Sequence, residues 1–128
     1  MFESFTDEAI KVIMQAQKEV SLLKSNVVSS EHILLGLIAE NKTRASKLLK
    51  KRRVNLIPAR LEVVKICGKQ DNFVDESADI PFTPKVKQIF KISVQKAKEF
   101  GQDKITPEHL FFALLSQDNT IATSVLKN

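Results

Sequence analysis

Residues 29–40 read SSEHILLGLIAE, and residues 106–115 read TPEHLFFALL. Each segment opens with a hydroxyl side chain, carries Glu-His shortly after it, and continues as an almost unbroken apolar run. Ser and Thr are preferred at the N-cap of a helix, and such a dense apolar run is typical of a helix buried on nearly all sides. The two segments therefore predict two buried helices of one design.

The similarity extends outward from these segments along most of the chain. A shift of 77 residues aligns 5–50 with 82–127 without a gap, and it pairs the only two histidines of the sequence. Self-similarity at a fixed offset indicates a structural repeat. We predict one helical unit written twice, with repeat 1 over 5–68, a surface linker over 69–81 and repeat 2 over 82–128.

The apolar spacing within each repeat predicts its other helices. The segments that begin at Thr6 and Thr83, the expected N-caps, show the i, i+3, i+4, i+7 spacing of an amphipathic helix. A shorter third helix is expected around 45–49 and again around 122–126. A fourth is expected from about Asn55 to Cys67, ending at Gly68.

Repeat 2 stops before any counterpart of this fourth helix. We therefore predict an all-α fold of about seven helices in a single domain over 1–128, with the last helix of repeat 2 missing. The apolar surface that such a helix would cover is expected to be exposed, or to be covered by a second copy of the chain in a homodimer.

The composition is that of a globular domain, with 43% hydrophobic and 27% charged residues among 128. No apolar run approaches the roughly 18 residues that a membrane span needs, and the acidic start of the chain is not typical of a signal or transit peptide. The single cysteine, Cys67, excludes an intrachain disulfide and is predicted to pack in the core.

The net charge of +5 arises largely from one stretch, 42–53, which holds seven basic residues. No aromatic residue that could stack on bases is interleaved with them. We interpret the stretch as a solvated helix end. A basic helical nucleic-acid-binding module is kept as the alternative function.

The segments FTDEAIKVIMQAQKEV (5–20), SSEHILLGLIAE, IPFTPKVKQIF (80–90) and ITPEHLFFALL (105–115) together resemble the double Clp repeat. This is the N-terminal domain of Clp-family AAA+ unfoldases of the ClpA/ClpC type, and the resemblance is closest to ClpC. It covers 2–127 and implies an eight-helix module with pseudo-twofold symmetry. Such modules capture protein substrates and adaptor proteins for ATP-driven unfolding and degradation, and in ClpC-type proteins they also receive arginine-phosphorylated proteins.

The resemblance implies a binding domain within a Clp ATPase or Clp protease complex, or a free-standing accessory protein of the same fold. The sequence has no GxxxxGK[ST] pattern, so ATP chemistry would reside in segments outside this chain. We expect no catalytic residues, no cofactor and no membrane partner. The expected location is the bacterial cytoplasm or the plastid stroma.

The resemblance also implies ligand-contacting residues. The glutamate of each Glu-His pair would contact the guanidinium of phosphoarginine, and the phosphate would lie near the N-terminus of a first helix. Glu8 stands where the family usually has a basic residue, whereas Lys85 keeps a positive charge in the second copy. We therefore expect the phosphoarginine pocket in repeat 2, formed by Thr83, Lys85 and Glu108.

A groove where the repeats meet, near Phe2, Phe82 and Lys85, is a further candidate site for adaptor peptides. Simpler structural roles are the alternative for the candidate residues. The glutamates would stabilise the helix dipole, and the phenylalanines would pack against the first helices. His32 and His109 lack further ligands at helical spacing, so we predict capping or packing rather than a metal site. The predicted ligand- and adaptor-binding residues are Thr6, Glu31, Thr83, Lys85, Glu108, Phe2 and Phe82.

Overall fold

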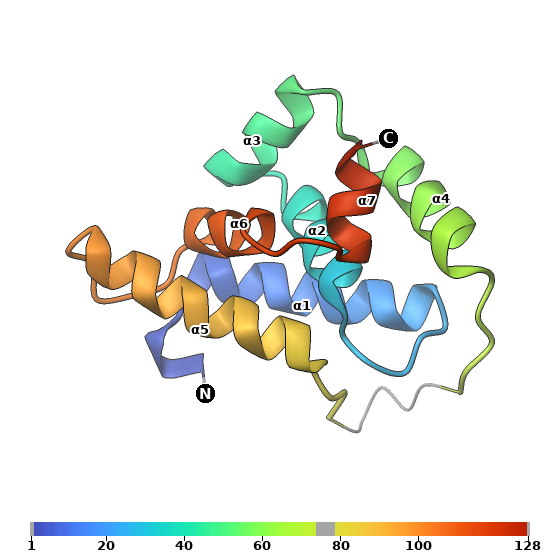
Figure 1. Ribbon diagram of the computed structural model, residues 1–128, viewed down its shortest axis with the longest axis horizontal. Coiled ribbons are helices and arrows are strands. Elements are labelled where there is room, and N and C mark those ends of the chain that lie inside the picture. The colour runs from blue at the N-terminus through green and yellow to red at the C-terminus, as the bar shows by residue number, and fades with distance from the viewer. Residues whose placement is uncertain (1, 74–78, 128) are drawn as a thin grey trace.

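The computed structural model describes residues 2–73 and 79–127, which form seven α-helices and one short 3-10 helix (Figure 1). The elements are η1 (Phe2–Ser4), α1 (Asp7–Leu22), α2 (Ser30–Ala39), α3 (Arg44–Lys51), α4 (Leu56–Cys67), α5 (Pro84–Glu99), α6 (Pro107–Leu115) and α7 (Ile121–Lys127). No strand occurs in these described ranges. The predicted all-α fold of about seven helices is confirmed, while residues 74–78 of the predicted linker lie outside the described residues.

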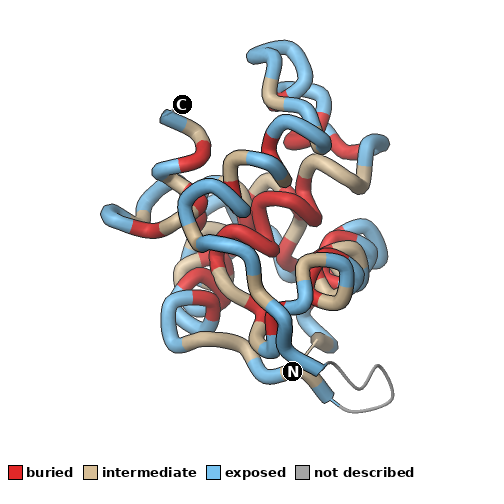
Figure 2. The backbone as a smooth tube through the Cα atoms, turned by 90° about the vertical axis from the view of Figure 1, so that its right-hand side faces the viewer, coloured by how far each residue is buried: buried red, intermediate tan, exposed pale blue. Residues whose placement is uncertain are grey.

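Helix α2 is the centre of the fold and packs against each of the other six α-helices. All of its residues from Ser30 to Leu37 are buried, and the buried segments gather in the interior of the molecule (Figure 2). A helix that contacts neighbours on every side must be apolar on every side. The dense apolar run of 29–40 is therefore explained by the central position of α2.

The predicted caps form where the sequence places them. The side chains of Thr6 and Thr83 accept hydrogen bonds from the amides of Ala9 at 3.2 Å and Val86 at 3.3 Å. Each threonine thereby satisfies one amide that the first turn of a helix leaves without an intrahelical partner. The first helices of both repeats thus begin at the predicted residues.

A reciprocal pair of backbone contacts joins the repeats. Phe5 of repeat 1 forms a parallel bridge with Ile105 of repeat 2, and Phe82 forms one with Val28. The Thr6 amide donates to the Ile105 carbonyl at 2.9 Å, and the Thr83 amide donates to the Val28 carbonyl at 3.0 Å. Each partner in one contact lies 77 residues from its counterpart in the other. The internal repeat therefore appears in three dimensions as an exchange of equivalent contacts.

The turn after the first helix has the same backbone shape in both repeats but different residues. Lys24 has φ 54° and Gly101 has φ 67°. In both turns the next amide donates to a carbonyl five residues back, Ser25 to Val20 at 3.0 Å and Gln102 to Ala97 at 2.8 Å. This left-handed helix ending suits glycine, whereas a side chain there strains the backbone by about 1 kcal/mol.

Helix α4 packs on the outside of repeat 1 through a small number of buried side chains. Ala59 and Val63 are its buried residues, and Arg60 donates two hydrogen bonds of 2.7 Å to the carboxylate of Glu19 on α1. The outward residues Ile57 and Leu61 are about two-thirds exposed. Helix α4 therefore covers repeat 1 with a narrow inner face.

None of the described helices is long and apolar enough to span a membrane.

We predict that Gly36→Ala destabilises the protein by about 1–3 kcal/mol. A Cβ atom at Gly36 would lie 2.5 Å from the Val12 carbonyl oxygen and 3.0 Å from the Ala16 amide nitrogen, both on the backbone of α1. Urea denaturation monitored by circular dichroism measures the change in the free energy of unfolding. Alanine favours an exposed helix interior over glycine by about 1 kcal/mol, so increased stability would contradict this close packing of α1 and α2.

Lys24→Gly is expected to stabilise the fold by about 0.5–1 kcal/mol, because glycine removes the strain of the left-handed turn. Lys24→Ala is the matched control. It removes the same 3.6 Å ion pair with Asp71, which is exposed and contributes little, but it keeps a side chain at the strained position. Equal stabilities of the two variants in thermal unfolding would refute the strain.

Candidate functional site

The phenylalanines predicted at the junction of the repeats form one aromatic cluster. Phe2 and Phe82 pack edge-to-face at 6.0 Å between ring centroids, and each also packs against Phe90, at 6.2 and 5.2 Å. Phe5 joins the cluster at 5.1 Å from Phe2 and 5.5 Å from Phe90. Edge-to-face pairs are favourable beyond the area they bury. Phe2 and Phe82, both half-buried, therefore fasten the two repeats together.

Helix α5 separates the three residues of the predicted phosphoarginine pocket. Thr83 caps the start of α5, and Lys85 lies exposed in its first turn. Phe100 caps the end of α5, and its ring lies 6.1 Å from that of His109, the neighbour of Glu108. Sixteen helical residues span about 24 Å. The predicted grouping of Thr83, Lys85 and Glu108 is therefore wrong.

The reciprocal contacts produce a different grouping, across the repeats. Thr6 is hydrogen-bonded to Ile105, three residues before Glu108, and Thr83 is hydrogen-bonded to Val28, three residues before Glu31. Each Glu-His glutamate thus belongs to the same end of the molecule as the first-helix cap of the other repeat. Alignment of the copies could not reveal this exchange, because it assigns equivalent residues without saying which copy they contact.

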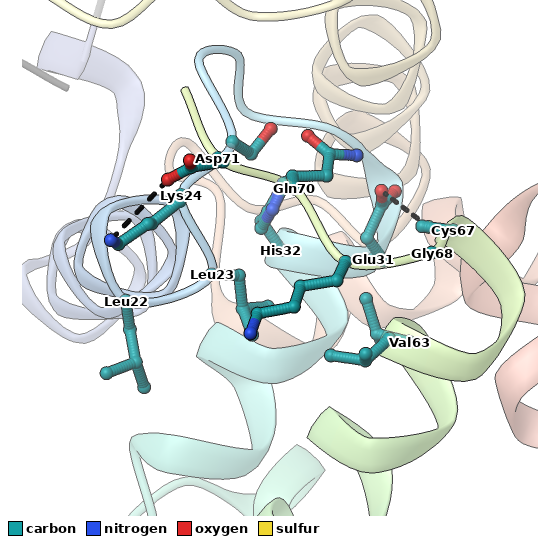
Figure 3. A pocket seen from close by; sticks show the side chains of 13 residues that line it. Leu22, Leu23, Lys24, Glu31, His32, Val63, Cys67, Gly68, Gln70 and Asp71 are labelled. Atoms are coloured by element: carbon teal, nitrogen blue, oxygen red, sulfur yellow. Dashed lines mark hydrogen bonds and ion pairs between the residues drawn. The ribbon is translucent and has the colours of Figure 1, made fainter. Parts of the chain in front are cut away.

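Glu31 lies in the wall of a cavity of about 550 Å³ between the end of α1, the start of α2 and the end of α4 (Figure 3). Its side chain is only 5% exposed. The Cys67 thiol donates to Oε2 at 3.7 Å, and Oε1 has no hydrogen-bond partner among the described residues. Burial raises the pKa of the Glu31 carboxyl, because desolvation disfavours the charged form. Beside the cavity, Glu31 thus keeps a buried carboxyl oxygen that has no hydrogen-bond partner among the described residues.

The walls of this cavity are mainly apolar and include Leu22, Leu23, Val63 and Val64, while the Lys24–Asp71 ion pair at 3.6 Å lies at its edge. Burial and the neighbouring Glu31 raise the pKa of Cys67 to about 11. A thiol with this pKa is protonated at neutral pH and a poor nucleophile. Cys67 is half-buried at the cavity wall and packs against the core, so it is less enclosed than predicted.

Glu108 has a more open environment than Glu31, although both occupy the first turn of an equivalent helix. Its side chain is half-buried, and Oε2 accepts a hydrogen bond of 3.3 Å from the Ala45 amide at the start of α3. Among the described residues, repeat 2 has no counterpart of α4 to cover it. Arg44, the exposed first residue of α3, is adjacent in sequence to the amide that Glu108 binds.

The two histidines close the capping boxes of the second helices. Nδ1 of His32 accepts from the Ser29 amide at 2.9 Å, and Nδ1 of His109 accepts from the Thr106 amide at 2.9 Å. Burial lowers the pKa of His32 to about 4, so the ring is neutral at pH 7. The predicted capping role is confirmed. No group of three metal-binding side chains occurs among the described residues.

Sequence reasoning missed the cavity beside Glu31. The sequence signals for it were weak: Cys67 ends an apolar stretch and Gly68 follows it, which is equally compatible with a packed core. What creates the cavity is the path of 68–71 past the end of α4 toward α1, where the Asn72 amide donates to the Lys24 carbonyl at 3.0 Å. Such a long-range contact has no local sequence pattern.

Comparison with known proteins identifies one family model, the Clp repeat (R) N-terminal domain, which matches residues 4–128. Chaperone protein ClpC1, chloroplastic, of Arabidopsis thaliana is 46% identical over all of this chain, which covers 14% of that protein. The ATP-dependent Clp protease ATP-binding subunit ClpA homolog of Guillardia theta is also 46% identical, over all of this chain and 15% of that protein. The chain thus spans about one-seventh of the length of these relatives.

Solved structures show the same architecture. The N-terminal domain of the chaperone ClpD from Arabidopsis thaliana superposes with a TM-score of 0.84 at 33% identity, covering 99% of this chain and 85% of that one. The Hsp104 N-terminal domain from Candida albicans superposes with a TM-score of 0.73 at 19% identity, covering 98% and 81%. At that lower identity the likeness supports the fold alone.

The neutral, buried His32 makes a specific prediction about stability and pH. Its pKa of about 4 in the folded protein lies below the ordinary histidine value of 6.5. Its contribution to stability is therefore complete above pH 6.5 and decreases as the pH falls toward 4, by up to about 1.4 kcal/mol per pH unit. We expect His32→Asn, whose amide oxygen can still accept from the Ser29 amide, to unfold in urea with a smaller loss of stability between pH 6.5 and 5.

Carboxyl groups titrate in both wild type and variant. The difference between the pH dependences of their free energies of unfolding therefore reports on His32 alone. His109→Asn is the companion variant: His109 has the same capping role and is 3% exposed, and burial also lowers its pKa, so this variant should change the pH dependence in the same direction. Identical pH dependence of wild type and His32→Asn would contradict a buried, neutral imidazole.

Proposed function

Because the chain belongs to the Clp repeat (R) N-terminal domain family, we propose that it is a docking module that receives protein substrates and adaptor proteins for a ClpC-type ATP-dependent unfoldase. The observation that carries the proposal is the match of the whole chain both to ClpC1 and to the solved ClpD N-terminal domain. The ATPase and the unfolding activity would belong to the remaining length of such longer proteins.

Within this role, we propose that the module recognises phosphoarginine through Glu108. A carboxylate pairs well with the planar guanidinium fork, and the Glu108 side chain is half-buried at the surface of the second repeat. One of its oxygens accepts the 3.3 Å hydrogen bond from the Ala45 amide. The other oxygen provides the second acceptor that a two-pronged contact with guanidinium requires.

The phosphate of such a ligand needs positive charge or free amides close to Glu108. Arg44 supplies an exposed guanidinium at the start of α3, next to the amide that Glu108 contacts. The first turn of α1 at the same end of the molecule carries Asp7 and Glu8, whose negative charges oppose a phosphate. We therefore propose that Arg44 binds the phosphate, in place of the basic residue that the family usually has at position 8.

Glu31 is the weaker candidate for this role. Its carboxyl is almost fully buried beneath α4 and the Cys67 thiol occupies one oxygen. Burial also raises the pKa of the Glu31 carboxyl, because desolvation disfavours its charged form. Aromatic rings at the junction, including Phe2 and Phe82, remain candidates for contacts with adaptor peptides.

The names of several relatives, including those from Arabidopsis thaliana and Pisum sativum, carry the word chloroplastic. We propose the plastid stroma as the location of this protein, with the bacterial cytoplasm as the other location compatible with the family. The comparisons give no support to the alternative of nucleic-acid binding through 42–53.

Isothermal titration calorimetry with free phosphoarginine tests the ligand assignment. We expect Glu108→Ala to weaken binding at least about tenfold, because it removes a charge-assisted hydrogen bond that contributes about 1.5–3 kcal/mol. Glu31→Ala is the matched control in the equivalent position and should change the affinity less than about twofold. Unmodified arginine should bind weakly to all three proteins.

Equal phosphoarginine affinity of wild type and Glu108→Ala would reject this pocket. If Glu31→Ala alone abolished binding, the ligand would enter the cavity under α4 instead. Pull-down of Clp subunits and adaptors from the source cells tests the broader docking role separately.

A further inference from the structure

Seven exposed basic residues lie on α3 and the short segments that flank it. Between Glu40 and Glu62 the sequence has no acidic residue. In the part of the chain that the structure describes, none of the seven forms an ion pair. Their charge is therefore available to a partner. We call them the basic cluster, and they are Lys42, Arg44, Lys47, Lys50, Lys51, Arg52 and Arg53.

The stability of α3 accounts for only part of the basic cluster. Lys50 and Lys51 lie in the last turn of α3, where the helix dipole favours cations. Arg44 and Lys47 lie in the first four residues of the same helix, where the dipole disfavours cations. Lys47 is also three residues from Lys50 and four from Lys51, spacings at which like charges repel each other. Lys47 therefore weakens α3 unless an anionic group binds beside it.

Lys47 and Lys50 border a hollow of about 390 Å³ between the end of α2, the helix α3 and the start of α4. Its walls include the apolar side chains of Ile38, Val54 and Leu56, which are all half-buried. The volume lies at the lower end of the roughly 300–1,000 Å³ that ligand pockets occupy. The hollow therefore suits one large apolar side chain that has negative charges next to it.

The internal repeat indicates that this side of α3 stays open when a helix packs on its other side. Lys47 and Lys50 correspond to Ser124 and Lys127 under the 77-residue shift. Both equivalents are exposed on α7, although α4 packs on α7. The charge is what differs, because Lys50 alone among the five cations over 42–51 has a basic equivalent. The hollow of repeat 1 is thus distinguished by its cations.

We propose that the hollow and the basic cluster dock an acidic segment of a partner protein, with one large apolar side chain in the hollow and carboxylates beside Lys47 and Lys50. This inference rests on the proposed docking role and specifies the chemistry of the partner. Complementary charge selects the partner, and a buried apolar anchor supplies affinity. A nucleic acid fits less well, because residues 41–61 include no aromatic side chain for base stacking and a phosphate does not fill an apolar hollow.

The probe is a fluorescein-labelled peptide with one central leucine and a run of glutamates on each side. One control peptide has serine in place of the leucine, and a second has lysines in place of the glutamates. Fluorescence anisotropy with the full 128-residue chain is measured at about 0.1 M ionic strength, where charges more than about 10 Å apart are screened. The acidic leucine peptide should bind at least about tenfold more tightly than either control.

Charge reversal locates the carboxylates of the peptide. The double variant Lys47→Glu, Lys50→Glu should bind the acidic peptide at least about tenfold more weakly and prefer the lysine peptide. The double variant Lys87→Glu, Lys91→Glu makes the same change in net charge on α5, which lies apart from α3 (Figure 1). It should alter the affinity less than about threefold. All four lysines are exposed, so circular dichroism should show both variants folded.

A second pair of variants locates the leucine. Leu56→Asp places a carboxylate in the wall of the hollow at the first residue of α4, where the helix dipole favours acidic side chains. It should weaken binding of the acidic leucine peptide at least about tenfold. Ile57→Asp is the matched control, because Ile57 is the next residue of α4, is 67% exposed and does not line the hollow. It should weaken binding less than about threefold.

Several outcomes would overturn the proposal. Equal affinity for the acidic leucine peptide and either control peptide, or equal effects of the two double variants, would each reject the docking site. Displacement of the acidic peptide by oligothymidine, with the steep salt dependence of phosphate contacts, would assign the basic cluster to nucleic acid.

The peptide experiment is independent of the phosphoarginine pocket. Glu108→Ala should change the affinity for the acidic leucine peptide less than about twofold, because Glu108 does not line the hollow. A wild-type chain that captures Clp subunits and adaptors but does not bind the acidic peptide would reject this site and leave the proposed docking role intact.

Discussion

The arrangement of the molecule depends on the exchange of backbone contacts between the repeats. Phe5 and Thr6 at the start of α1 bind the segment before α6, and Phe82 and Thr83 at the start of α5 bind the segment before α2. In each repeat the two exchanged segments lie at opposite ends of the first helix, so α1 and α5 must run in opposite directions, as Figure 1 shows. Buried amides and carbonyls outside helices need such partners. The exchange satisfies them and at the same time determines which ends of the two repeats meet.

One consequence is that the same motif occupies two environments. Glu31 and Glu108 hold equivalent positions, but α4 closes over Glu31 and leaves it 5% exposed with one oxygen unpartnered. Glu108 is half-buried and hydrogen-bonded to the start of α3. Removing a carboxylate from water is costly unless it is paired, so burial shifts Glu31 toward its neutral form. Within the described residues, the presence of α4 over one copy therefore gives two equivalent glutamates different exposure.

The sequence predicts the local features of the fold but does not predict which segments of the two repeats contact each other. Helix positions, the caps at Thr6 and Thr83 and the roles of both histidines follow from spacing and capping chemistry within a few residues, and the structure confirms them. The pocket of Thr83, Lys85 and Glu108 was wrong because an internal alignment cannot tell contacts within a copy from contacts between copies. The cavity at Glu31 likewise depends on residues 68–71 returning toward α1, a long-range feature without a sequence signature.

The two repeats agree where they pack and differ where they face solvent. Core positions such as Val28 and Ile105, or Leu37 and Leu114, carry similar apolar groups, because a close-packed interior tolerates little change in volume. Outside the core, Glu8 of repeat 1 is equivalent in the alignment to Lys85 of repeat 2, and Lys47 is equivalent to Ser124. A symmetric body can therefore present unequal surfaces to its partners. Since charge complementarity controls the choice of partner more than the strength of binding, the basic α3 makes repeat 1 and repeat 2 distinguishable to a bound protein despite their common framework.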